Sequence, residues 1–148
     1  MSDVNTLKNI PHLSTLNFVL LTLVTAGVYL IVWQFMNTPK IEKITSKGIA
    51  DHNFLVAIAA CFGLSGVLSA STEPVTLMIS GLLSIALFVL YIIWAFKAKV
   101  ALQGYATTEL KVDLRMNGIY TFLFTVFYIN YCINEVSESD KSLQAAVE

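Results

Sequence analysis

Residues 75–96, VTLMISGLLSIALFVLYIIWAF, form an unbroken apolar run without Asp, Glu, Lys, Arg or His. The 22 residues of this run exceed the roughly 20 that a helix needs to cross a hydrocarbon core of about 30 Å. A surface helix of a soluble bundle needs a polar stripe that faces water, and residues 82–96 offer only Ser84 and Tyr91 for one. The run therefore predicts a membrane-spanning helix.

Three further windows share this lack of charge. The chain carries 9 Lys and Arg against 10 Asp and Glu, so 13% of its residues are charged, 56% are hydrophobic and the net charge is −1. Soluble domains carry about 25% charged residues, and a nucleic-acid-binding domain is usually basic. The composition argues against both classes, and the distribution of the charges favours a membrane protein over a soluble one. Inside lipid, each window must pair its backbone groups internally as a helix, which predicts spans at about 16–36, 54–71, 75–96 and 117–134.

We therefore expect residues 1–148 to form a single all-α membrane domain, a four-helix transmembrane bundle. The loops at 37–53 and 97–116 hold seven of the nine Lys and Arg residues. Loops rich in Lys and Arg lie in the cytoplasm, so both loops are expected there, and the N- and C-termini on the non-cytoplasmic side. The predicted location is the bacterial cytoplasmic (inner) membrane, as a multi-pass protein.

Two of the windows end with the same aromatic pattern. Tyr29 precedes Trp33 by one turn, Tyr91 is followed by Trp94, and a lysine follows each pair. Trp and Tyr favour the headgroup level of a bilayer, so we interpret these four aromatic residues as interfacial anchors. The likeness is compatible with a two-plus-two internal repeat and with anchors that arose independently.

Small residues mark one helix face in the second and third windows. The helix-packing candidates recur at intervals of four residues: Ala57, Cys61, Ser65 and Ser69, then Ser80 and Ser84. Small side chains let helix backbones approach closely in membranes. The stripe is interpreted as internal packing between the second and third spans, with a dimer interface as the alternative.

The windows lack the ionisable groups that usually mark ion paths, proton relays or catalysis in a membrane. Gln34 and Asn130 could line a polar cavity, although amides inside membranes mostly hydrogen-bond between helices. The predicted depths of Cys61 and Cys132 differ by about 10 Å, which is too far for a disulfide. With no metal-ligand spacing, phosphate loop or nucleophile motif, we expect no enzyme, no catalytic residue, no cofactor and no metal.

Two short stretches resemble a known family. The run Leu20-Leu-Thr-Leu-Val-Thr-Ala-Gly-Val-Tyr29, followed by Trp33, resembles the Thr-x-Gly-Ile-Tyr opening of the small bacterial membrane proteins grouped as domain of unknown function 4234. Residues 127–134, FYINYCIN, are similar to the closing helix of that family. The resemblance implies a small membrane protein and brings no functional residue with it.

The expected function is a non-enzymatic interaction or accessory module. Its partners are expected to be the lipid bilayer and another membrane protein or a second copy of the chain, without nucleic acid. The alternatives are a small oligomeric channel or transporter, which predicts a hydrated polar cavity at the midplane, and an immunity protein against a bilayer-targeting toxin, which predicts a toxin-like neighbouring gene. The sequence identifies no substrate, partner or pathway.

Overall fold

The computed structural model describes residues 13–109 and 114–145, and within them it contains five helices and no strand. The helices are α2 (Thr15–Val24), α3 (Val28–Thr45), α4 (His52–Leu68), α5 (Pro74–Thr108) and α6 (Gly118–Ala145). The all-helical part of the predicted fold class is confirmed. In this part of the chain, α5 is the one helix that is long and apolar enough to cross a membrane by itself, while α2 and α4 are apolar but shorter.

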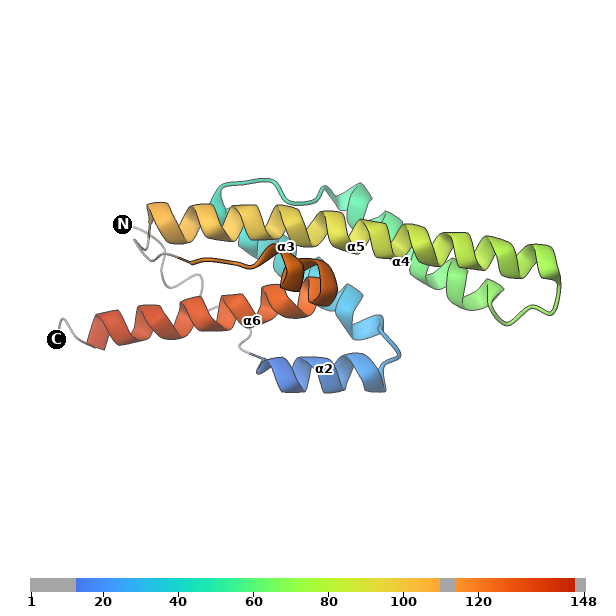
Figure 1. Ribbon diagram of the computed structural model, residues 1–148, viewed down its shortest axis with the longest axis horizontal. Helices are drawn as coiled ribbons and strands as arrows, with labels where there is room; N and C mark the ends of the chain where they lie inside the picture. The colour runs from blue at the N-terminus through green and yellow to red at the C-terminus, as the bar shows by residue number, and fades with distance from the viewer. Residues whose placement is uncertain (1–12, 110–113, 146–148) are drawn as a thin grey trace.

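The α5 helix is the axis of the molecule. Its 35 residues span about 52 Å at 1.5 Å per residue, and Pro74 occupies its first turn, where proline costs no hydrogen bond. The α4 helix, joined to α5 by residues 69–73, runs antiparallel beside it. Together they form a hairpin that projects beyond the other helices (Figure 1).

The predicted cytoplasmic loop 97–116 is helical over its first half, because α5 continues to Thr108. The sequence predicts that the helix ends at residue 96, because the charged residues Lys97 and Lys99 follow. The residues between and after them nevertheless form an apolar stripe at helical spacing. The buried members of the stripe are Ala98, Ala101, Leu102, Tyr105 and Ala106, and burial of this face against the other helices explains the extension.

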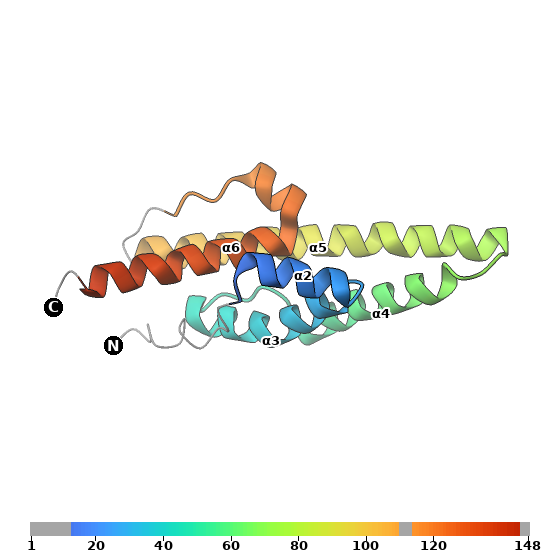
Figure 2. The ribbon, with the colours of Figure 1, turned by 90° about the horizontal axis from the view of Figure 1, so that it is seen from below.

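The predicted span 16–36 is two helices in the structure. The α2 helix ends at Val24 and α3 begins at Val28, after a turn at residues 25–27. The two helices run in opposite directions in both views (Figures 1 and 2). The α3 helix then continues to Thr45 with Pro39 inside it, so the first half of the predicted loop 37–53 is also helical.

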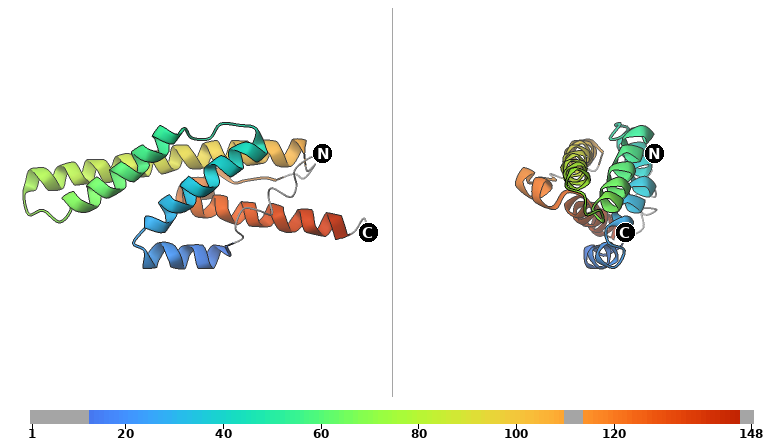
Figure 3. Two further views of the ribbon diagram at one scale, coloured as in Figure 1. Left: turned by 180° about the vertical axis from the view of Figure 1, so that it is seen from behind. Right: turned by 90° about the vertical axis from the view of Figure 1, so that its right-hand side faces the viewer.

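The predicted span 117–134 is bent. Thr125 has non-helical backbone angles (φ 38°, ψ −111°) that divide α6. The segment before the kink crosses the direction of α5, and the segment after it runs in the same direction as α5 (Figure 2). The helices α3, α5 and α6 therefore finish at the same end of the molecule (Figure 3). An up-and-down bundle would have separated the ends of α5 and α6, so the chain topology differs from the predicted one.

The core lies where α2, α3, α5 and α6 meet, at one side of the molecule. Its largest buried side chains include Phe18, Trp33, Trp94 and Ile129. The projecting part of the α4–α5 hairpin is different, because most of its large apolar side chains are exposed. The chain thus has a packed end and an apolar, unpacked end.

Candidate functional site

The turn between α2 and α3 is built around the hydroxyl of Thr25. This hydroxyl donates to the carbonyl oxygen of Leu21 (2.7 Å) and accepts the backbone N–H of Tyr29 (3.0 Å). The backbone N–H of Gly27 donates to the carbonyl oxygen of Thr22 (2.8 Å). One side chain therefore ends α2 and supports the first turn of α3, where backbone groups lack helical partners.

Gly27 is required by two features of this turn. Its φ is 92°, a left-handed conformation that side chains with a Cβ rarely adopt. A Cβ at this position would lie 3.1 Å from Cε2 of Phe62, which approaches from α4. The Thr25–Tyr29 segment is thus a structural turn that seats the α2–α3 hairpin against α4.

Aromatic residues of α2, α3, α5 and α6 form one cluster. The Phe18 ring lies 5.8 Å from Tyr29, 5.2 Å from Trp33 and 5.3 Å from Phe127, measured between centroids. Trp33 in turn meets Trp94 edge to face at 6.2 Å. Such geometries stabilise aromatic pairs beyond the area that they bury, and they tie α2, α3, α5 and α6 together.

The four predicted interfacial anchors lie inside this packed end. Trp33 is 2% exposed and Trp94 is fully buried, while Tyr29 and Tyr91 are half-buried. The indole N–H of Trp94 donates to the hydroxyl of Thr38 (3.0 Å). Because the protein itself satisfies this polar group, Trp94 can be buried. The two tryptophans therefore join helices inside the protein. This differs from the predicted position at the headgroup layer.

Three polar atoms of the core have no partner among the described residues. They are the indole nitrogen of Trp33 and both amide atoms of Gln34. Asn130 is also buried, and its amide nitrogen lies 3.5 Å from the carbonyl oxygen of Leu13, which also accepts from Asn134 (3.1 Å). Gln34 and Asn130 are thus both buried, and no hydrogen bond joins them.

The small-residue stripe takes part in the α4–α5 contact. The hydroxyl of Ser80 donates to the carbonyl oxygen of Ser65 (2.9 Å) and so links α5 to α4. Both serines are buried, Ala57 and Cys61 are half-buried, and Ser69 and Ser84 are exposed. The other three serine hydroxyls donate to carbonyls of their own helix. These contacts favour internal packing over a dimer interface for Ser65 and Ser80.

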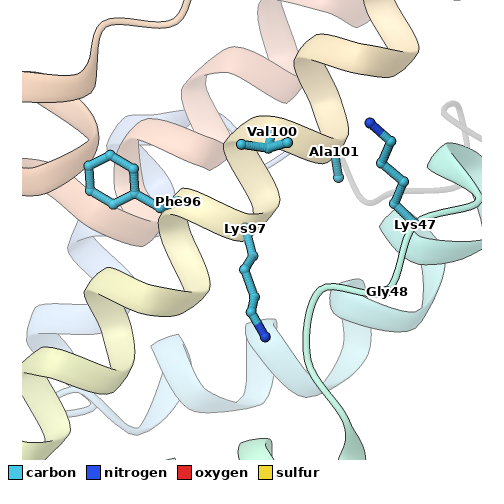
Figure 4. Close-up of a pocket in the computed structure, with 6 residues that line it drawn as sticks. All are labelled: Lys47, Gly48, Phe96, Lys97, Val100 and Ala101. Carbon is cyan, nitrogen blue, oxygen red and sulfur yellow. The ribbon is translucent and has the colours of Figure 1, made fainter.

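A basic pocket lies between α5 and the loop after α3. It has a volume of about 330 Å³ and is lined by Lys47, Gly48, Phe96, Lys97, Val100 and Ala101. The side chains of Lys47 and Lys97 extend in opposite directions, and the other lining side chains, those of Phe96, Val100 and Ala101, are apolar and belong to α5 (Figure 4). The pocket begins at the last residue of the apolar run of α5.

Glu42 fixes the loop that forms one wall of this pocket. One carboxylate oxygen accepts the backbone N–H groups of Ile49 (2.6 Å) and Ala50 (2.9 Å). Hydrogen bonds to a carboxylate acceptor are stronger than neutral ones, so the loop that carries Lys47 and Gly48 is held against α3. Sequence reasoning missed Thr25, Glu42 and this pocket. The only signal for the turn was a glycine inside an apolar run, a typical mark of a helix end.

Cys61 and Cys132 are both free cysteines. Cys132 lies in the packed core, and burial raises the pKa of its thiol to about 11. The reactive form of a cysteine is the thiolate, so Cys132 is a poor nucleophile at neutral pH. Within residues 13–109 and 114–145, no group of three His, Cys, Asp or Glu side chains could hold a metal ion.

Comparison with known proteins finds one family. The profile described as Domain of unknown function (DUF4234) matches residues 13–103, which comprise α2, α3, α4 and most of α5. The match includes the Thr25–Tyr29 turn and the basic pocket but ends before residues 127–134, so the likeness at those residues stays a prediction. No curated protein and no solved structure matches the chain.

Proposed function

The chain belongs to the family described as Domain of unknown function (DUF4234), and we propose that it is a non-enzymatic interaction module anchored in a membrane by α4 and α5. The partner is another membrane protein or a second copy of the chain. A multi-pass position in a bacterial inner membrane is part of the same proposal.

The exposed apolar surface of α5 is the observation that carries this proposal. In its most apolar 18-residue window, only 6% is buried within the protein. Met78, Leu82 and Ile85 are each more than 60% exposed. Burial of one such side chain contributes about 1.5–3 kcal/mol of favourable free energy, which is lost if the side chain stays in water. A helix that is apolar all round belongs in a protein core or a membrane. Acyl chains are the environment that matches this surface.

The α4 helix accompanies α5 through the bilayer. The two helices pack side by side, and the Ser80–Ser65 hydrogen bond joins them in their apolar part. The 17 residues of α4 give about 26 Å, so the turn residues complete the crossing. In this proposal two helices cross the membrane as one hairpin, in contrast to the four crossings expected from the sequence.

Two other apolar segments are proposed to enter only one leaflet. The α2 helix has 10 residues and a length of about 15 Å, and its exposed Leu23 and Val24 lie at the tip of the α2–α3 hairpin. The segment before the Thr125 kink exposes Ile119 and Leu123. Both segments, α2 and the part of α6 before the kink, lie near the base of the projecting hairpin (Figure 2). This position is consistent with insertion into one leaflet of the membrane.

The charges indicate which side is cytoplasmic. Lys40, Lys43 and Lys47 lie in and after the last turns of α3, and Lys97 follows the apolar run of α5, whereas the α4–α5 turn carries Glu73. The positive-inside rule assigns the lysine-rich side to the cytoplasm. The end of α6 lies on that side too (Figure 1). This orientation reverses the non-cytoplasmic C-terminus expected for a four-span bundle.

The hydrogen bonds of the proposed spans favour an interaction module over a channel. All four serines of the stripe donate to backbone carbonyls of α4 or α5. Their hydroxyls therefore serve helix packing and do not line a hydrated path. The surface left for a partner is the packed, charged end that the cytoplasmic halves of α3, α5 and α6 form together.

Cysteine labelling tests the anchor and its orientation. Thr72→Cys, Thr107→Cys and Glu135→Cys are made one at a time in the Cys61→Ala, Cys132→Ala chain and treated with a membrane-impermeant maleimide. We expect Thr72→Cys to be labelled in intact cells, and the other two only after permeabilisation. Labelling of Glu135→Cys together with Thr72→Cys in intact cells would contradict two spans. Labelling of Thr107→Cys and Glu135→Cys in intact cells, with Thr72→Cys labelled only after permeabilisation, would contradict the proposed orientation but not the two spans.

A further inference from the structure

We propose that the basic pocket between Lys47 and Lys97 binds the phosphate headgroup of an anionic phospholipid whose acyl chains lie along α5. The inference rests on the proposed membrane anchor and adds a defined lipid partner to it. The pocket has two cationic side chains and no carboxylate in its lining, which is the charge that such a headgroup requires.

A continuous apolar stripe leads from the proposed span to the pocket. Val89, Ile93, Phe96 and Val100 follow one another at intervals of three or four residues, so they share one face of α5. All four are exposed, and Val100 is 58% exposed. The last two also line the pocket. An acyl chain that lies on this stripe brings its headgroup to the lysines.

The lysines are available for an anion. Among the described residues, neither ammonium group has a carboxylate within ion-pair distance. The Lys97 ammonium lies 5.7 Å from the centre of the Phe54 ring, a cation–π contact that orients its stem. Lysines at this depth extend their charged ends toward the headgroup layer, where anionic lipids attract them.

The pocket is held in shape before any lipid binds. The two hydrogen bonds from Ile49 and Ala50 to Glu42 fix the loop that carries Lys47. On α5, Gly104 makes room for the Lys47 side chain, because a Cβ there would lie 2.7 Å from the ammonium nitrogen. A preorganised site lowers the entropic cost of binding, which favours one retained lipid over a diffuse ionic layer.

The lining favours a lipid over free phosphate. Phe96, Val100 and Ala101 of α5 contribute apolar side chains to the lining of the pocket (Figure 4). An apolar wall contributes to the binding of an amphiphile through buried area and contributes nothing to an inorganic ion. The occupant is therefore a phospholipid such as phosphatidylglycerol.

Native mass spectrometry of the full chain tests the inference. The protein is released from micelles that contain equal amounts of phosphatidylglycerol and phosphatidylcholine, and retained lipids are counted. We expect one phosphatidylglycerol to be retained preferentially. In the Lys47→Gln, Lys97→Gln chain its apparent affinity should fall roughly thirtyfold, because two charge contacts of about 1 kcal/mol each are removed. Added inorganic phosphate should not displace the lipid.

The matched control is Lys40→Gln, Lys43→Gln, which removes the same charge from α3 outside the pocket. This chain should keep the lipid. Equal loss in both variants, equal retention of the two lipids, or displacement by inorganic phosphate would overturn the inference. Unchanged helical circular dichroism of both variants verifies the fold. If cysteine labelling shows two spans but the protein has no lipid preference, the proposed lipid site is wrong and the proposed membrane anchor is still supported.

Discussion

At the scale of single residues, the α2–α3 turn depends on one glycine. Gly27→Ala imposes a left-handed backbone on an L side chain, which costs roughly 1–2 kcal/mol, and brings a Cβ against Phe62. We expect a lower midpoint of thermal unfolding in detergent. Ala26→Gly is the control, because Ala26 also has a positive φ of 49° and glycine relieves it. Equal stability of the two variants would contradict this view of the turn.

Gln34 offers a second test at this scale. A buried amide without a partner costs about 1–3 kcal/mol, and both amide atoms of Gln34 are in that state. Gln34→Met keeps the length of the side chain and removes the unpaired groups, so the free energy of unfolding should stay the same or rise. A loss of stability would mean that the amide has a partner, such as an internal water. Thermal unfolding, monitored by circular dichroism, shows whether the substitution raises or lowers the stability.

At the scale of elements, the α4–α5 hairpin is stabilised by a hydrogen bond between its helices. Ser80→Ala removes the donor to the carbonyl of Ser65, and such bonds in membranes contribute about 0.6 kcal/mol. Ser84→Ala is the matched control, since its hydroxyl donates to Ser80 within α5. Unfolding by denaturing detergent should show the larger loss for Ser80→Ala. A larger loss for Ser84→Ala would argue against internal packing of the stripe.

The elements that composition alone determines were predictable from the sequence. The run 75–96 lies inside α5, and the window 54–71 overlaps α4, because long uncharged stretches leave few alternatives to an apolar helix. The break at residues 25–27 was not predictable in this way. A glycine in an apolar run is tolerated in a helix and also ends one, and the hydrogen bonds of Thr25 decide between them.

The candidate site was predictable only where it is local in sequence. Serines four residues apart share a helix face, and this indicated the Ser65–Ser80 contact. The sequence analysis interprets Trp94 as an interfacial anchor because tryptophan favours the headgroup level, and the sequence does not reveal that Thr38 provides a partner for its indole N–H inside the protein. The basic pocket joins Lys47 to Lys97 across some fifty positions, and only the packing of the loop held by Glu42 brings them together.

At the scale of the whole molecule, polar and apolar parts are separated along one axis. The packed end contains the aromatic cluster and the ends of α3, α5 and α6, and the α4–α5 hairpin projects from it (Figure 3). In water, the exposed apolar surface of this hairpin would be unfavourable, and the proposed membrane anchor accounts for it. The separation therefore matches a protein with one part in the bilayer and one part outside it.

Spin-label accessibility along α5 tests this account most directly. Labels at cysteines that replace Met78, Leu82, Ile85 and Val89 report collisions with oxygen, which concentrates among acyl chains, and with a water-soluble nickel complex. All four side chains are exposed in the protein, so in lipid vesicles oxygen should dominate at every position. Dominant collisions with nickel at Leu82 or Ile85, or protection from both reagents, would contradict a hairpin surrounded by lipid.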